Sequence, residues 1–383
     1  MSLPANATLS PTPFKIAIPQ KDIDDLEVLL RLSKLPPPTY EGSLKQYGVT
    51  NAWMKEMKAY WETSFNWRKH EAEINKLPQF TVPVKNLDGN EYSIHFIGIY
   101  SKNPDAVPLL LMHGWPGSFL EFLDIIPILA ASTSPAYHII VPSLPGYAYS
   151  TQGALNKPFG MTDVAYLMNE LMVGLGFGAA NGGYVAQGGD IGAMLSRIQQ
   201  YRYADCKAAH VNMFIAAGEH SLEGLTEQEV INSTRLGSFR STGSAYAQMH
   251  ATRPSTIGHA LASSPLALLA WVGEKLLEWT DVDPPVEKIL QLVTMWWFTE
   301  TFPRSIYPYR ELLSADLMAP ATTKPFGYSM FPKELVPTPK AWVDAETNGK
   351  LVWYKGHESG GHFAAMELPE VLAQDINEFV LGL

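Results

Sequence analysis

The segment at residues 184–192, Tyr-Val-Ala-Gln-Gly-Gly-Asp-Ile-Gly, constrains the fold of this 383-residue chain more than any other. Its first residues are mostly apolar, as in a buried strand, and Gly188 and Gly192 stand two residues to either side of Asp190. This spacing is typical of a strand–turn–helix elbow, a turn so tight that only small flanking residues fit and whose tip exposes a nucleophile. Such elbows usually present serine, whereas this one presents a carboxylate.

The aspartate narrows the chemistry that the elbow can perform. A serine that attacked an alkyl carbon would form an ether, which a histidine-activated water cannot cleave. An aspartate that attacked the same carbon would form an ester, which that water can hydrolyse. A turn or helix-capping aspartate is the plainer interpretation, but the buried strand before Asp190 and the amphipathic helix after it favour a nucleophile. The segment therefore predicts attack on an electrophilic sp3 carbon.

A serine nucleophile can be tested against the same spacing. No serine in the sequence has glycine both two residues before it and two residues after it. Ser329 follows Gly327 but precedes Phe331, and Ser359 precedes Gly361 but follows His357. An ordinary serine esterase of this architecture is therefore not indicated.

Strand-like and helix-like segments alternate around the elbow. Apolar runs predict buried strands at 107–112 and 137–141, and further strands at 327–331 and 350–354. Helices are expected at 119–130, 161–175 and 191–202, and a hairpin joins 80–84 to 92–100. This alternation predicts an α/β fold with a doubly wound, mostly parallel sheet.

Two helical regions interrupt or precede that pattern. Apolar residues at three- to four-residue spacing between residues 53 and 68 indicate a helical extension, residues 1–78, packed on the core. The core is assigned to 79–217 and 323–383, and the all-helical stretch 218–322 is expected to form a cap over the carboxyl ends of the strands, where such sheets bind ligands. The aromatic residues 296–298 in that stretch are either core or the lining of an apolar substrate pocket.

Composition excludes several classes of function. A formal net charge of -10, with no basic stripe, argues against binding to nucleic acid. Cys206 is the single cysteine, so an intrachain disulfide is impossible and a reducing compartment is expected. The longest apolar run, 266–272, is far shorter than the ~20 residues of a membrane span, and no signal peptide is evident. A soluble, cytoplasmic protein is expected.

Three potential catalytic residues follow one another in the chain order of the α/β-hydrolase fold, namely nucleophile, acid and histidine. His362, in Gly-Gly-His-Phe after the last expected strand, is predicted to be the base that activates water. Glu334, after the strand at 327–331, is the candidate that orients it, although Asp344 or Glu346 could take that place.

The loop at 113–116, His-Gly-Trp-Pro, follows a buried strand and can supply an oxyanion-binding N–H. We expect the N–H groups of Trp115 and Ile191 to be the two donors. The Trp115–Pro116 bond is a candidate for the cis form, and His113 is expected to be structural.

Together these motifs resemble the epoxide hydrolases, specifically the microsomal-type branch in its soluble fungal form, over nearly the whole chain. The resemblance rests on residues 113–118, 142–147, 188–192, 331–335 and 357–363 together with the helical N-terminal extension. It implies two ring-opening tyrosines in the cap, which map onto Tyr246 and Tyr309, and it implies that the acid is Glu334, where related fungal sequences can carry aspartate. It further implies hydrolysis of a small apolar or aromatic epoxide to a vicinal diol without a metal or organic cofactor, and a possible homodimer.

Two rivals use the same framework. A haloalkane dehalogenase shares the aspartate, histidine and water, but commonly has tryptophan directly after the nucleophile, where this chain has Ile191. A non-catalytic hydrolase-fold binding protein would be expected to lack the nucleophile, the base or the oxyanion loop, and the sequence retains all three.

Overall fold

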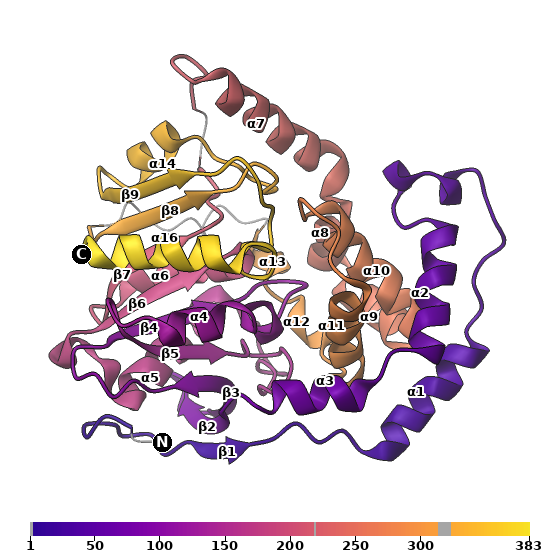
Figure 1. Ribbon diagram of the computed structural model, residues 1–383, viewed down its shortest axis with the longest axis horizontal. Coiled ribbons are helices and arrows are strands. Elements are labelled where there is room, and N and C mark those ends of the chain that lie inside the picture. Colours follow the sequence, from indigo (N-terminus) through magenta and orange to yellow (C-terminus); the bar gives the residue numbers. More distant parts are fainter. Residues whose placement is uncertain (1–2, 218–219, 313–322) are drawn as a thin grey trace.

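A computed structural model describes residues 3–217, 220–312 and 323–383 of the chain. Within these residues nine strands form one sheet in the order β1-β2-β3-β5-β4-β6-β7-β8-β9 (Figure 1). From β5 to β9 all neighbouring strands are parallel, whereas β1, β2 and β3 join that half through antiparallel pairs. The predicted mostly parallel sheet is confirmed.

The parallel half carries the predicted strands at nearly the expected positions, together with β7, which the sequence pattern did not predict. Its strands are β4 (Val107–Met112), β5 (Tyr137–Pro142), β6 (Tyr184–Gly188), β7 (Cys206–Val211), β8 (Phe326–Met330) and β9 (Leu351–Gly356). All residues of β6 and β8 are buried, because helices cover both faces of the sheet. The sequence therefore shows continuous apolar runs there rather than alternation.

The antiparallel half begins with a strand that the sequence pattern does not reveal. β2 (Gln79–Lys85) and β3 (Glu91–Ile99) form the predicted hairpin, in which the Asn86 side chain accepts from the N–H groups of Asp88 and Asn90. β1 (Thr12–Phe14) adds to its edge, although it lies within residues 1–78, which were expected to form a helical extension. Three residues are too short for an alternating pattern to stand out.

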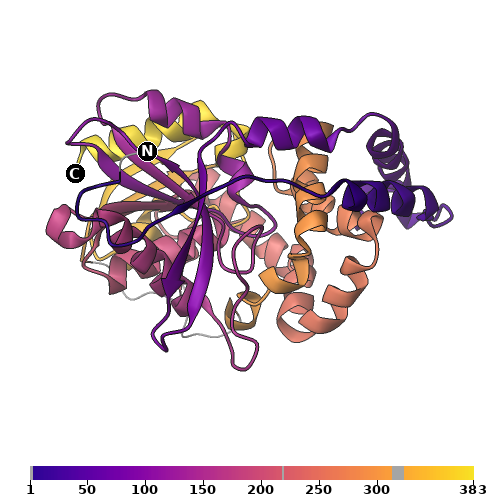
Figure 2. The same ribbon diagram turned by 90° about the horizontal axis from the view of Figure 1, so that it is seen from below.

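Two helices pack on each face of the sheet. α4 (Ile125–Ala131) contacts α16 (Pro369–Leu381) on one face, and α5 (Met161–Met172) contacts α6 (Asp190–Arg202) on the other (Figure 2). The single helix expected at 119–130 is instead a 3-10 turn (Phe119–Phe122) followed by α4. The helix expected at 161–175 changes to a π-helical turn (Val173–Phe177) beyond α5, because Gly176 adopts a φ of 97°.

Helices between β7 and β8 lie beyond the carboxyl ends of the strands (Figure 1). They are α7 (Glu227–Ser238), α8 (Ala245–Thr252), α9 (Pro254–Ala262), α10 (Pro265–Glu278), α11 (Val286–Thr299), α12 (Phe302–Ser305) and α13 (Tyr309–Leu312). Both ends of the insertion expected at 218–322 fall on residues outside the described ranges, so that division of the chain into domains stays a prediction.

The N-terminal helices pack beside this cap. α1 (Gln20–Leu32), α2 (Asn51–Thr63) and α3 (Trp67–Ile74) contact α10 and α11 (Figures 1 and 2). Tyr60 donates to Glu287 of α11 at 2.6 Å, and His70 lies 2.5 Å from the other oxygen of that carboxylate. The aromatic pattern at 53–68 is split between two helices because Asn66 caps the second, accepting from Lys69 N–H.

Two short helices complete the architecture, α14 (Lys340–Glu346) before β9 and α15 (Ala364–Glu367) after it. Across the described ranges no single helix is long and apolar enough to cross a membrane, although α9 and α10, bent at 117°, reach that length and composition as a pair.

Candidate active site

Asp190 lies at the tip of the expected elbow, between the end of β6 and the first turn of α6. Its φ is 49°, a left-handed conformation that is unusual for a residue other than glycine. The flanking glycines allow this turn: a Cβ on Gly192 would lie 1.9 Å from the carbonyl oxygen of Met112, and one on Gly188 would lie 2.3 Å from the carbonyl carbon of Gly192. The fold thus excludes larger side chains at both positions. The Asp190 carboxylate lies at the carboxyl end of β6.

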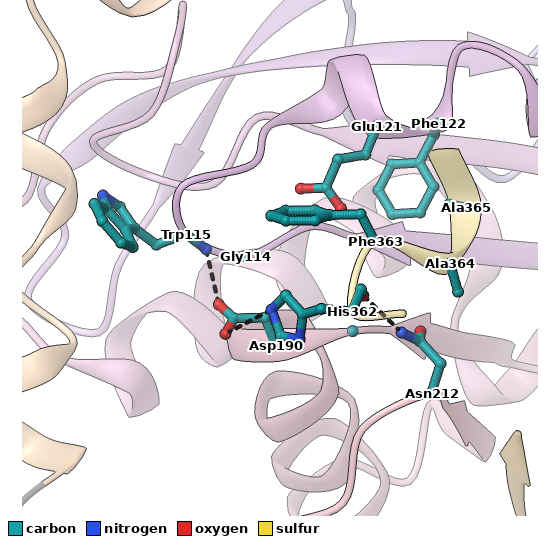
Figure 3. A pocket seen from close by; sticks show the side chains of 11 residues that line it. Gly114, Trp115, Glu121, Phe122, Asp190, Asn212, His362, Phe363, Ala364 and Ala365 are labelled. Atoms are coloured by element: carbon teal, nitrogen blue, oxygen red, sulfur yellow. Dashed lines mark hydrogen bonds and ion pairs between the residues drawn. The ribbon is translucent and has the colours of Figure 1, made fainter. Parts of the chain in front are cut away.

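The loop after β4 contacts that carboxylate directly. Trp115 N–H donates to Asp190 Oδ1 at 2.8 Å (Figure 3), and the Trp115–Pro116 bond is cis. His113 fixes the loop from behind, since its Nε2 accepts from Leu144 N–H at 3.1 Å and burial lowers its pKa to about 4. Ile191, the next residue of α6, is buried at the same helix N-terminus, where backbone N–H groups point out of the helix.

His362 and Glu334 reach the site from the loops after β9 and β8. His362 Nε2 lies 3.3 Å from Asp190 Oδ2, and its Nδ1 lies 2.7 Å from Glu334 Oε1. The same oxygen of Glu334 accepts from Leu335 N–H at 2.5 Å, so the carboxylate is fixed by its own loop. Of the acids considered from sequence, Glu346 instead pairs with His220 at 2.8 Å and Asp344 lies on the same helix as Glu346.

The charges around His362 favour its protonated form. Burial would lower the pKa of this imidazole, but the Glu334 carboxylate opposes it and Asp190 adds to that effect, so the pKa stands well above the usual value. His362 is 3% exposed and Glu334 is fully buried. In this state the imidazolium lies between two carboxylates, and its pKa depends on the charge of Asp190.

Tyr246 of α8 and Tyr309 of α13 meet above the same loop. Their ring centroids lie 5.7 Å apart, with the ring planes at 77° to each other. Tyr246 stacks on Trp115 at 5.3 Å, and Tyr309 meets Trp115 edge-on at 5.7 Å. Burial raises the pKa of both phenols and the nearby Asp190 adds to this, so both carry a proton at neutral pH.

A small cavity opens beside Asp190 (Figure 3). Its volume is about 10 Å³, close to what a single water requires, and Asp190, His362, Glu121 and Asn212 line it. Burial raises the pKa of Glu121 to about 8, an effect that His362 opposes and Asp190 reinforces. A protonated carboxyl at neutral pH can both donate to and accept from a water.

Sequence reasoning did not single out Glu121, His250 or Lys275. His250 is buried against Trp115 at 4.6 Å and Tyr309 at 4.7 Å, and burial lowers its pKa to about 3. Lys275 lies over the ring of Tyr246 at 4.7 Å. Glu121 comes from the turn after the β4 loop and the other two come from cap helices, so only the three-dimensional packing of these elements brings them to the site.

The aromatic segment 296–298 has a mixed role. Trp296 is 1% exposed and its indole N–H donates to the carbonyl of Pro116 at 2.8 Å, which places it in the core beneath the loop after β4. Together with the half-buried Trp297 and Phe298, it also lines a hollow of about 680 Å³ beside α1. The described residues contain no cluster of three or more His, Cys, Asp or Glu that could hold a metal ion.

This elbow, histidine and acid at the carboxyl ends of a mostly parallel sheet define an α/β-hydrolase fold. The family model described as "alpha/beta hydrolase fold" matches residues 107–232, and the one described as "Epoxide hydrolase N terminus" matches residues 11–122. A putative epoxide hydrolase of Dothistroma septosporum is 42% identical over 99% of this chain and 92% of that protein. The chain belongs to the epoxide hydrolase family.

Solved structures agree with this assignment. The epoxide hydrolase of Aspergillus niger superposes with a TM-score of 0.91 at 44% identity, covering 99% of this chain and 98% of that one. The juvenile hormone epoxide hydrolase of the silkworm Bombyx mori gives a TM-score of 0.83 at 28% identity, covering 98% and 94%. Both likenesses extend over the core and the cap, so the similarity includes the tyrosine-bearing helices.

Proposed function

We propose that this epoxide hydrolase opens its substrate through a covalent alkyl ester on Asp190. The observation that carries the proposal is that one carboxylate is contacted by a backbone N–H and an imidazole, and that two phenols lie close to it. Trp115 N–H contacts Oδ1 at 2.8 Å, His362 Nε2 lies 3.3 Å from Oδ2, and the two cap phenols stand over the same loop.

In the first half of the reaction, Asp190 attacks a ring carbon of the epoxide and the carbon–oxygen bond of the ring breaks. Tyr246 and Tyr309 donate hydrogen bonds to the departing ring oxygen, which acquires negative charge. Phenols suit this role because the leaving alkoxide is strongly basic. Their raised pKa values keep the protons in place until that charge develops.

In the second half, a water attacks the carbonyl carbon of the ester and His362 takes its proton. Formation of the ester removes the negative charge of Asp190, one of the influences that hold the pKa of His362 high. Loss of this charge lowers the pKa of His362, so the imidazole can release its proton to the alkoxide formed by ring opening and can then act as the base. Glu334 at Nδ1 keeps Nε2 directed at the site of attack.

The tetrahedral intermediate of this step carries an oxyanion. We assign the N–H groups of Trp115 and Ile191 as its donors, each typically contributing about 3–4 kcal/mol to such an intermediate. The cavity lined by Asp190, His362 and Glu121 suits the attacking water by its size and polar lining. Collapse of the intermediate releases a vicinal diol and restores the Asp190 carboxylate.

The aromatic surroundings of the two tyrosines support a small apolar or aromatic epoxide as substrate. Trp115, Trp279 and Phe302 add apolar surface around them. The cytoplasmic location and the homodimer stay predictions.

The proposal is tested by supplying purified protein with styrene oxide and, in parallel, with 1-bromobutane. Vicinal diol from the epoxide without halide release from the bromide is the expected result. Halide release without diol would favour the dehalogenase reaction, and binding of the epoxide without turnover would favour a non-catalytic protein.

A further inference from the structure

Lys275 is a buried ammonium that the two half-reactions leave without a role. It belongs to α10, its side chain is 4% exposed, and its Nζ lies 2.6 Å from the adjacent Glu274 carboxylate, which is 28% exposed. Burial of a charged group costs free energy even when the group is paired. The long side chain of a lysine could instead extend from the helix into solvent. Its inward direction therefore points to a use inside the cap.

Aromatic rings surround the ammonium. The nearest is Tyr246, whose ring centroid lies 4.7 Å from Nζ, and Trp271 and Trp279 follow at 5.7 and 5.9 Å. A cation over a ring face is attracted to it, most strongly where water is excluded. The lysine is thus held over the phenol that we assign to ring opening.

The same phenol also connects to the nucleophile. Tyr246 stacks on Trp115, whose N–H holds the Asp190 carboxylate, and it contacts Trp279, whose ring lies 5.2 Å from that of His362. Tyr246 therefore has a positive group, Lys275, over its ring and a negative group, Asp190, close enough to raise its pKa.

Charge moves between these two groups during ring opening. Before the step, the negative charge is on Asp190; in the transition state, part of it has moved to the epoxide oxygen and the phenol that donates to it. A fixed cation beside that phenol stabilises the transition state more than the starting complex, which is the condition for acceleration. In the hydrolysis step the oxyanion forms at Trp115 and Ile191 instead, so the same cation should matter less there.

We propose that Lys275 is a positioning residue that promotes epoxide opening electrostatically through Tyr246. This inference rests on the function proposed above. Glu274 offsets part of the lysine's charge, and Glu278, whose pKa is raised by burial and by Glu274 and lowered by Lys275, is a further acid of the same helix. His250, packed on Tyr246 at 5.5 Å, stays neutral and leaves the lysine as the cation of this cluster among the described residues.

The test is a single-turnover comparison of Lys275→Met and Lys275→Arg with the native chain, using styrene oxide and following the alkylated protein by mass. Methionine keeps the length and apolar stem of lysine but removes its charge. We expect alkylation to slow roughly tenfold in Lys275→Met, hydrolysis of the alkyl-enzyme to change less than about twofold, and Lys275→Arg to retain most of the rate. Equal slowing of both steps, or native alkylation in Lys275→Met, would overturn the proposal.

A double substitution separates electrostatics from packing. In a Tyr246→Phe background the lysine has no phenol to act through, so adding Lys275→Met should slow alkylation little further, whereas in a Tyr309→Phe background its effect should persist. The same effect in both backgrounds would contradict action through Tyr246.

Should Lys275→Met not fold, Glu274→Gln serves in its place. Removal of the offsetting charge should make alkylation faster, and an unchanged or slower alkylation would overturn the proposal. Native chain that turns over epoxide without an Asp190 adduct would refute the covalent mechanism itself, a result distinct from an adduct that forms equally fast with and without Lys275.

Discussion

The nucleophile elbow and the tyrosine pair are built in different ways. The elbow depends on main-chain geometry within a few residues: two glycines, a left-handed φ of 49° at Asp190 and the N–H of Trp115. The tyrosine pair depends on ring contacts between helices, since Tyr246 and Tyr309 are 63 residues apart and meet over Trp115. The elbow therefore tolerates almost no change of shape, whereas the pair tolerates changes that preserve aromatic packing.

Removal of the nucleophile should have the largest effect. Asp190→Ala leaves no group to form the ester, so we expect diol formation to fall by roughly 10⁴-fold or more. The measurement is steady-state turnover of styrene oxide, with Asp105→Ala, a change at an exposed loop aspartate, as the control. Retained turnover in Asp190→Ala would show that the elbow does not supply the nucleophile.

Removal of the base should stop the reaction halfway. In His362→Gln the ester can form but water is not activated, so turnover should fall by about 10²–10⁴-fold while alkylated protein accumulates. Mass analysis of the intact protein after mixing with substrate checks this. A variant that turns over normally, or that is slow without accumulating adduct, would contradict the assignment.

The tyrosine pair should show partial redundancy. Because we propose that both phenols donate to one oxygen, Tyr246→Phe or Tyr309→Phe alone should slow alkylation about 10-fold, and the double variant about 10²–10³-fold. Phenylalanine keeps the ring contacts, so the melting temperature should hardly move. Alkylation at the native rate in the double variant would show that neither tyrosine of the cap takes part in ring opening.

Glycine substitutions compare the rigidity of the two regions directly. Gly192→Ala places a methyl group 1.9 Å from the Met112 carbonyl oxygen, and we expect a loss of about 2–3 kcal/mol in the free energy of unfolding. Gly237 of the cap helix α7 has no atom within 4 Å of such a methyl, so Gly237→Ala should be neutral or stabilise by about 0.5–1 kcal/mol. Urea denaturation measures the free energy of unfolding of both variants. Equal changes in the two variants would contradict the difference in rigidity between the elbow and the cap.

The histidines of the two regions should respond oppositely to pH. The folded-state pKa of His362 is raised, so its contribution to stability is present below the unfolded value near ~6.5 and is lost as pH rises through the raised value. Burial lowers the pKa of His250 to about 3, so its contribution is lost as pH falls below ~6.5, by up to about 1.4 kcal/mol per unit. The difference in the free energy of unfolding between the native chain and His362→Gln should shrink towards high pH. The difference between the native chain and His250→Gln should shrink towards low pH. Two differences that change with pH in the same direction would contradict this pair of predictions.

The sequence predicted the residues around the elbow better than the two tyrosines of the cap. Asp190, Trp115 and His362 follow strands directly, so strand order alone places them at one edge of the sheet. Glu334 could not be separated from Asp344 and Glu346 by spacing, because the turn that directs its carboxylate to His362 Nδ1 is set by local backbone bonds such as that from Leu335 N–H. The tyrosines were available only through resemblance, since their positions depend on how α8 and α13 pack.

The secondary structure, too, was predicted best where the sequence pattern is long and regular. Long, periodic or fully apolar segments such as β4 and α6 were predicted to within a residue or two. The edge strand β1 and the break between α2 and α3 were not, because three paired residues and one capping asparagine leave little trace in a hydrophobic pattern.

The most direct test of the covalent mechanism is a single turnover in water enriched in oxygen-18, with enzyme in excess over epoxide. Water attacks the carbonyl of the ester, so the label should enter the carboxylate of Asp190, and mass analysis of the peptide containing residues 184–192 should show it. Label found in the diol with none in that peptide would mean that water attacks the epoxide directly and that Asp190 forms no ester.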